Sequence, residues 1–303
     1  MSAPAIEVRG VGRRFRSTVA LDDVDLAVEP DTIVGLMGRN GAGKTTLMAL
    51  LAGQDFPTAG SVRIFGEDPV ENDAVLSRLC FVREAQQYPN NFRVAHVLGI
   101  GPHFYPEWDS ELAERLVDAF GLPRRRQVQK LSRGMRAAVG VITGLASQAP
   151  LTIFDEPVLG LDATSRQLFY DELIKAYAER PRTILLSTHL IDEAAAALEQ
   201  VVVLDRGRVA LSGDVDELRR RASTLTGPVE AVHELIGSAT VLHQEPLGGY
   251  VRATVELTPS PDLRSRAQAL GVDVSPVPLQ ALVVRTGLLG APEDNPASEG
   301  ALR

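Results

Sequence analysis

The stretch Gly38-Arg39-Asn40-Gly41-Ala42-Gly43-Lys44-Thr45-Thr46 decides the fold of this 303-residue chain. It fits the phosphate-binding pattern G-x-x-x-x-G-K-S/T. Thr32–Met37, directly before it, is an apolar run typical of a buried strand, and Leu47–Ala52, directly after it, is typical of a helix that ends at Gly53. A strand, a glycine-rich loop and a helix in this order predict a loop that wraps a chain of phosphate groups.

The residue types in this loop suit a triphosphate, which is densely anionic. Glycines at positions 38, 41 and 43 let many backbone N–H groups approach the phosphates, and the following helix directs the positive end of its dipole at them. Lys44 is expected to reach the β- and γ-phosphates, and the Thr45 hydroxyl is expected to bind Mg²⁺. The alternative is a glycine-rich turn that only connects strand to helix.

Composition narrows the classes of partner. The net charge of −8 and the pI near 5.3 argue against a nucleic-acid surface, so the arginine runs 124–126 and 219–221 are interpreted as solvated helix ends or turns. The single cysteine, Cys80, excludes an intramolecular disulfide and suits a reducing cytoplasm. The N-terminus lacks a signal pattern and no run reaches the length of a membrane span, so we expect a chain that does not cross a membrane by itself.

Strand and helix patterns alternate through the first two thirds of the chain. Strands are predicted at Ile6–Arg9, Val24–Val28, Gly60–Gly66, Leu79–Val82, Leu151–Phe154 and Thr183–Leu186, with a hairpin over Val201–Leu211. Helices are predicted after Asp109, over Ala137–Ala146 and after Asp162. This alternation predicts an α/β fold with a mostly parallel sheet, an antiparallel β edge and a helical subdomain at about residues 86–148.

The pattern changes after about residue 215. Short helices are predicted at Asp216–Arg221 and Pro261–Leu270, and strands at Val251–Leu257 and Ala281–Val284. Residues 216–303 are therefore expected to form a small α+β appendage without chemistry of its own, with a disordered tail over Gly290–Arg303.

Polar side chains follow two of the predicted strands. Asp155 and Glu156 come directly after Leu151–Phe154, at the strand edge where ligands sit in open α/β sheets. Asp155 suits the Mg²⁺ shell, and Glu156 suits the polarising of a water that attacks the γ-phosphate. His189, which follows the next strand, is a candidate for binding the γ-phosphate or the water. The alternatives are an acidic turn that caps a helix, and a histidine with a structural role.

These residues together resemble the nucleotide-binding subunits of ABC (ATP-binding cassette) transporters. The resemblance covers about residues 4–215, and the motifs stand in family order. Gly38–Thr46 resembles the Walker A loop, Ile153–Glu156 the Walker B strand, Leu159–Asp162 the D-loop, and His189 the switch histidine. The P-loop NTPase fold is what this family implies for the main domain.

The signature segment is the least regular motif. Leu131-Ser132-Arg133-Gly134-Met135 stands where the family most often has L-S-G-G-Q. Ser132 and Gly134 match, whereas Arg133 and Met135 depart. Such substitutions are similar to those in the branch of drug, lipid and polysaccharide exporters, so the resemblance favours export over import.

The family resemblance implies a site for ATP and Mg²⁺. ATP would be bound by Phe15, which aligns with an adenine-stacking aromatic, and by Gly38, Arg39, Asn40, Gly41, Ala42, Gly43, Lys44, Thr45 and Thr46. Lys44, Glu156 and His189 would be catalytic, Thr45 and Asp155 would bind Mg²⁺, and Asp162 would belong to the D-loop. The alternative role of Phe15 is core packing. The Q-loop residue, usually glutamine, is either Glu84, which is in register, or Gln86.

The resemblance also implies partners. ATP would be sandwiched between the Walker A loop of one copy and Ser132, Arg133, Gly134 and Met135 of another, in a homodimer or heterodimer. Separate transmembrane permease subunits would hold the chain on the inner face of the cell membrane, where its ATP hydrolysis drives transport. No nucleic acid is expected. The alternative function is a soluble ABC-type ATPase in translation or DNA repair, although such proteins usually join two cassettes or insert a long coiled coil.

Overall fold

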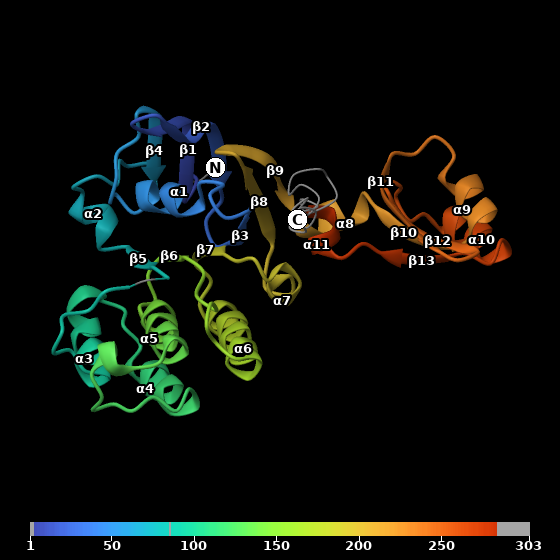
Figure 1. Cartoon of the computed structure of the whole chain (residues 1–303). Helices are drawn as coiled ribbons and strands as arrows, with labels where there is room; N and C mark the ends of the chain where they lie inside the picture. The colour runs from blue at the N-terminus through green and yellow to red at the C-terminus, as the bar shows by residue number, and fades with distance from the viewer. Residues whose placement is uncertain (1–2, 85, 284–303) are drawn as a thin grey trace, which may run out of the picture. The chain divides into compact units, whose positions relative to one another are not determined.

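The computed structural model describes residues 3–84 and 86–283 (Figure 1). These residues divide into two compact units, the first ending at Val215 and the second beginning at Asp216. Each unit has its own hydrophobic core. Within the described ranges, none of the helices has the length and apolarity needed to cross a bilayer.

The main sheet of the first unit has six strands in the order β5-β6-β7-β3-β8-β9. In chain order these are β3 (Ile33–Met37), β5 (Leu79–Val82), β6 (Leu151–Phe154), β7 (Thr183–Ser187), β8 (Gln200–Asp205) and β9 (Arg208–Asp214). All neighbours pair in parallel except β8 and β9. Every residue of β3, β6 and β7 is buried, as expected for parallel strands covered on both faces.

A second, antiparallel sheet has the strand order β2-β1-β4, from β1 (Ile6–Phe15), β2 (Thr18–Val28) and β4 (Ala59–Ile64). Helix α1 (Lys44–Leu51) contributes Leu47, Met48, Leu50 and Leu51 to a core that also contains side chains of both sheets. The helix that follows the phosphate loop is thus fixed by apolar packing, which holds its N-terminus in place.

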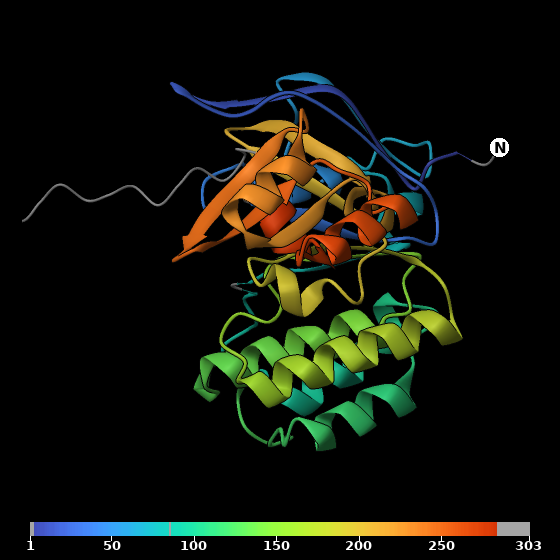
Figure 2. The same cartoon turned by 90° about the vertical axis from the view of Figure 1, so that its right-hand side faces the viewer.

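The other helices of the first unit are α2 (Asp73–Leu76), α3 (Val94–Phe104), α4 (Ser110–Ala119), α5 (Arg133–Ala146), α6 (Ala163–Glu179) and α7 (Ile191–Ala194), with a 3₁₀ turn at Val128–Lys130. Helices α3, α4 and α5 lie together, away from strands β1, β2 and β4, in both views (Figures 1 and 2). Asp109 caps α4 by accepting from the Leu112 amide at 2.8 Å. Its own amide donates to Ala146 at the end of α5.

Helix α8 (Val215–Arg220) begins at the last residue of the first unit and continues into the second. The second unit then contains β10 (Ser223–Pro228), α9 (Val229–Ile236), β11 (Val241–Leu247), β12 (Tyr250–Val255), α10 (Pro261–Ala269), β13 (Asp273–Pro276) and α11 (Leu279–Val283). From β10 to β13 the order β-α-β-β-α-β forms an antiparallel sheet with neighbours β11-β12-β10-β13. This is the connectivity of the ferredoxin-like motif. Helices α9 and α10 pack on one face of the sheet.

The predicted α/β class with a mostly parallel sheet is confirmed. The strand expected at Ala281–Val284 is wrong, because α11 covers Leu279–Val283. Leu279, Leu282 and Val283 are its buried residues, a spacing of three and four that fits a helix. Helices α2, α3, α7 and α9 and strands β10, β11 and β13 were not predicted. The expected disordered tail lies outside the described residues.

Candidate functional site

The phosphate loop is folded so that one of its sides is tightly packed and another is open. A Cβ atom added at Gly38 (φ +145°) would lie 2.3 Å from the Leu204 carbonyl oxygen, and one at Gly43 (φ +106°) would lie 2.6 Å from the Ala20 carbonyl oxygen. Only glycine fits these approaches. A Cβ at Gly41 (φ +81°) would meet nothing within 4 Å. The loop is therefore held from behind by β8 and β2 and leaves open space at its middle.

Lys44 is buried at the start of α1, with 8% of its surface exposed. Its Nζ donates to the carbonyl oxygens of Gly38 at 2.7 Å and Arg39 at 3.3 Å. In the described part of the chain, the acceptors of the Lys44 ammonium are these two neutral carbonyl groups. A buried cation beside the positive end of a helix, without a carboxylate partner, forms a site where an anion is stabilised.

A hydrogen-bond network joins this loop to the ends of β6 and β7. The Thr45 hydroxyl donates to Oδ2 of Asp155 at 3.0 Å. The Ser187 hydroxyl donates to Oδ1 of Asp155 at 2.9 Å and accepts from the Glu156 amide at 2.8 Å. Parallel pairing of Phe154 with Leu186 brings these strand ends together. The Asp155 carboxylate, 5% exposed, is thus fixed by one hydroxyl on each oxygen.

Glu156 has a left-handed backbone, with φ +49°. A non-glycine residue pays on the order of 1 kcal/mol for this conformation, and such strain clusters at functional sites. The Ser187 bond to its amide and the Leu159 amide, which donates to its carbonyl, hold it there. Its Oε2 lies 2.8 Å from Nδ1 of His189. Two residues from adjacent strand ends therefore meet as a carboxylate–imidazole pair.

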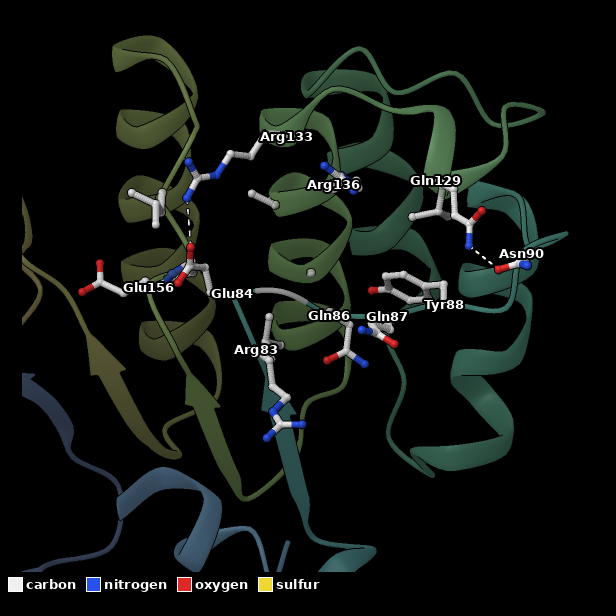
Figure 3. A pocket seen from close by; sticks show the side chains of 16 residues that line it. Arg83, Glu84, Gln86, Gln87, Tyr88, Asn90, Gln129, Arg133, Arg136 and Glu156 are labelled. Carbon is white, nitrogen blue, oxygen red and sulfur yellow. Dashed lines mark hydrogen bonds and ion pairs between the residues drawn. The ribbon is translucent and has the colours of Figure 1, made fainter. Parts of the chain in front are cut away.

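A cavity of about 550 Å³ opens beside Glu156 (Figure 3). Both Q-loop candidates line it. Glu84 lies at the end facing Glu156, and its Oε1 pairs with Nη2 of Arg133 at 2.9 Å. Gln86 lies further along the loop, on the side of Tyr88. The cavity thus joins the general-base candidate to the signature segment, and Glu84 is the Q-loop candidate that contacts the signature.

The signature and the D-loop pack against each other within the chain. The Ser132 hydroxyl caps α5 by accepting from the Met135 amide at 3.2 Å. A Cβ added at Gly134 would lie 2.5 Å from the Gly160 carbonyl oxygen, so this helix start needs a glycine. Asp162 caps α6, and the Ser165 amide, by donating to it, lowers the pKa of the Asp162 carboxyl. In the described ranges, no hydrogen bond or ion pair joins Ser132–Met135 to the phosphate loop of the same chain.

Phe15 ends strand β1 with 45% of its surface exposed, so the alternative of core packing is wrong. The Arg13 guanidinium lies 4.4 Å from the ring centroid. Two bonds to Asp55, at 2.9 and 2.6 Å, hold Arg13 in place. Adenine stacking stays a prediction, and the cation beneath the ring is compatible with it.

Sequence analysis did not identify two residues that support the candidate site. Ser187 connects Asp155 to Glu156, and Arg13 supports Phe15. The signal for Ser187 was its place at the end of the strand that neighbours the Asp155 strand. Arg13 stands two residues before Phe15, on the same face of β1.

Comparisons with known proteins agree with these motifs. A family described as "ABC transporter" matches residues 21–159. The sulfate/thiosulfate import ATP-binding protein CysA of Rhodopseudomonas palustris is 31% identical over 98% of this chain and 84% of its own length. The Nod factor export ATP-binding protein I of Cupriavidus metallidurans is 34% identical over 70% of this chain and 72% of its own length.

Solved structures lead to the same family. The structure described as the ATP binding subunit of an ABC transporter aligns with a TM-score of 0.64 and 26% identity, over 71% of this chain and 92% of that one. Both sequence relatives exceed 30% identity over more than two thirds of their length. The chain belongs to the ABC transporter family and is an ATP-binding, ATP-hydrolysing subunit that serves ATP-driven transport.

Proposed function

We propose that Lys44 and the phosphate loop bind the triphosphate of ATP, and that Glu156 activates the water that attacks its γ-phosphate. The observation that carries this assignment is the network in which the buried Asp155 accepts from Thr45 and Ser187, while Ser187 also holds the strained Glu156. It brings an anion cradle, a metal-binding carboxylate and a candidate base to one edge of the sheet.

Thr45 and Asp155 are the proposed Mg²⁺ ligands. Their oxygen donors lie 3.0 Å apart, and hydroxyl and carboxylate oxygens are what this hard cation prefers. The described residues contain no group of three or more His, Cys, Asp or Glu side chains able to form an all-protein metal cage. That fits Mg²⁺, which usually takes few protein ligands and completes its shell with phosphates and water. When bound, it would neutralise charge on the phosphates.

Glu156 and His189 are the proposed catalytic pair. The Glu156 side chain is 12% exposed, and the residue is part of the lining of the cavity. This limited exposure suits a carboxylate that accepts a proton from one positioned water. Through Nδ1, His189 fixes the orientation of that carboxylate, and its 51% exposed ring leaves the other nitrogen available to the γ-phosphate.

The nucleotide site is proposed to be completed by a second copy. A phosphate held by its own loop alone stays open to water on one side. Ser132, Gly134 and the start of α5 offer a hydroxyl proton, backbone N–H groups and a helix dipole that could close that side. In the described residues no bond joins the signature to the phosphate loop of the same chain, which is compatible with a contact supplied by another copy. Homodimer and heterodimer both satisfy this geometry.

The chain is proposed to act on separate transmembrane permease subunits at the inner face of the cell membrane. ATP-binding subunits of this family generally pair with such permeases, and the described helices of this chain cannot span a bilayer. The alternative, a soluble ABC-type ATPase in translation or DNA repair, is not favoured, because the relatives reported above are transport subunits.

We favour export, because the segment Leu131–Met135 resembles that of exporters and the Nod factor relative is an export subunit. Import is the second candidate, since the match to the sulfate/thiosulfate import subunit covers 98% of the chain and so includes most of the second unit. Inside-out vesicles carrying the chain with its co-purified permease distinguish them. Export predicts ATP-dependent accumulation of an amphiphilic probe such as a Nod factor, whereas ATP-dependent release of preloaded sulfate would favour import.

Replacing Ser187 by Ala should lower ATP turnover while ATP binding persists. The change removes one bond from Asp155 and the bond that holds the Glu156 amide, so both groups lose their fixed position. We expect turnover to fall by about ten- to a hundredfold, with a higher Mg²⁺ concentration needed for half-maximal activity. Phosphate release is measured across a Mg²⁺ titration. Ser265→Ala, in the second unit, is the control, and wild-type turnover in Ser187→Ala would contradict the network's role.

Mixing two inactive variants tests the shared site. Lys44→Ala breaks the phosphate loop and Ser132→Arg breaks the signature, so each homodimer should be inactive. In the mixed dimer, one site joins the broken loop to the broken signature and the other joins intact parts. About half of the wild-type ATPase rate should return if the two sites act independently. Verified mixed dimers with no recovered activity would argue against a signature that acts across the interface.

A further inference from the structure

Two departures from the family's usual motifs contact each other in this chain. Arg133 stands at a signature position that is usually glycine, and Glu84 stands at the Q-loop position that is usually glutamine. Nη2 of Arg133 lies 2.9 Å from Oε1 of Glu84, as the dashed line in Figure 3 shows. With the usual residues at both positions this ion pair could not form, so it is a property of this chain.

The side chain of Arg133 also contacts a third motif, the D-loop. A Cβ added at Gly160 of the D-loop would lie 3.0 Å from Cγ and 3.2 Å from Cδ of Arg133. The arginine stem therefore lies against the D-loop backbone on its way to Glu84. One side chain thus contacts the D-loop and the Q-loop from the start of the signature helix.

The start of α5 carries an excess of positive charge, which a nearby anion would stabilise. Arg133 and Arg136 occupy its first turn, which contains no acidic residue. Cations are unfavourable at this positive end of a helix, so the arrangement costs stability unless an anion is near. Among residues 3–84 and 86–283, the anionic partner of Arg133 is Glu84, and Arg136 forms no ion pair. Glu84 occupies the position that a more highly charged anion could take.

We propose that the Arg133–Glu84 ion pair is an internal latch that the nucleotide of a partner copy must open. Without ATP, Glu84 holds the Arg133 side chain within its own chain. When two copies close, the γ-phosphate bound by the other copy competes with Glu84 for the guanidinium, and Glu84, which already lines the cavity with Glu156, is freed from the ion pair. This inference rests on the nucleotide site shared between two copies that is proposed above.

The exposure of the pair sets the size of the effect. The two side chains are 61% and 45% exposed, so solvent and salt weaken their attraction. An ion pair this exposed shifts an equilibrium by a factor of about five at most. A triphosphate carries more charge than one carboxylate and can displace it. The latch therefore raises the ATP concentration needed for closure without preventing closure.

A double-mutant cycle in the Glu156→Gln protein, in which hydrolysis is expected to be slow, tests the latch. Sedimentation velocity gives the ATP concentration at which half of the protein is dimeric. Glu84→Gln should lower this concentration by about two- to fivefold, because Arg133 is released in advance. Arg133→Gln should raise it by about tenfold, because a charge-assisted contact to phosphate is lost. In the Arg133→Gln background, Glu84→Gln should have no further effect.

A matched ion pair provides the control. Arg180 and Glu107 lie 3.0 Å apart with exposures of 52% and 59%, and neither belongs to an ATP motif. Glu107→Gln should leave the half-dimer ATP concentration unchanged. Thermal unfolding of every variant shows whether these substitutions keep the fold.

The outcomes separate the latch from the shared site. A Glu84→Gln effect that persists in the Arg133→Gln background would show that Glu84 acts alone, and no effect of Glu84→Gln at all would also remove the latch. An Arg133→Gln protein that dimerises like its parent would remove the phosphate contact. A parent that binds ATP but stays monomeric would overturn the shared site itself, and the latch with it.

Discussion

The site depends on one buried carboxylate with a hydroxyl on each oxygen. Asp155 is 5% exposed, and burying an ionised group this far is costly unless its oxygens are satisfied. Thr45 and Ser187 satisfy them. They reach it because the order β6-β7-β3 and the parallel pairing of these strands bring the loop after β3 and the ends of β6 and β7 to one edge. The strand order of the sheet therefore fixes the positions of the candidate site residues through one carboxylate, that of Asp155.

The same hydrogen-bond network extends from the phosphate loop to Glu156, at the edge of the cavity beside the signature segment. Ser187 joins Asp155 to the left-handed Glu156, and Glu84 and Arg133 line the same cavity as Glu156. A displacement of Asp155 would reach Glu156 through Ser187, which is bonded to both residues. None of the residues proposed for the chemistry lies in the second unit, which has a hydrophobic core of its own.

Local signals in the sequence predicted most residues of the candidate site. The phosphate loop, Asp155, Glu156 and the mostly parallel sheet follow from short motifs and apolar runs. The contacts made by Ser187 and the Arg133–Glu84 pair could not be predicted, because they join residues some thirty to fifty positions apart whose meeting depends on strand order and packing. In the second unit the elements are short, so an apolar run such as Ala281–Val284 fits strand and helix equally until burial at Leu279 and Leu282 decides.

The central claim is that Glu156 activates water at a site where Lys44 and the loop bind ATP. The most direct test compares equilibrium binding of Mg-ATP with the rate of phosphate release in Glu156→Gln. The account predicts unchanged ATP affinity and turnover lowered by a factor of about 10² to 10⁴, the usual contribution of a positioned general base. Turnover near that of the wild type, in a folded protein that binds ATP, would contradict the account and assign the base to another group.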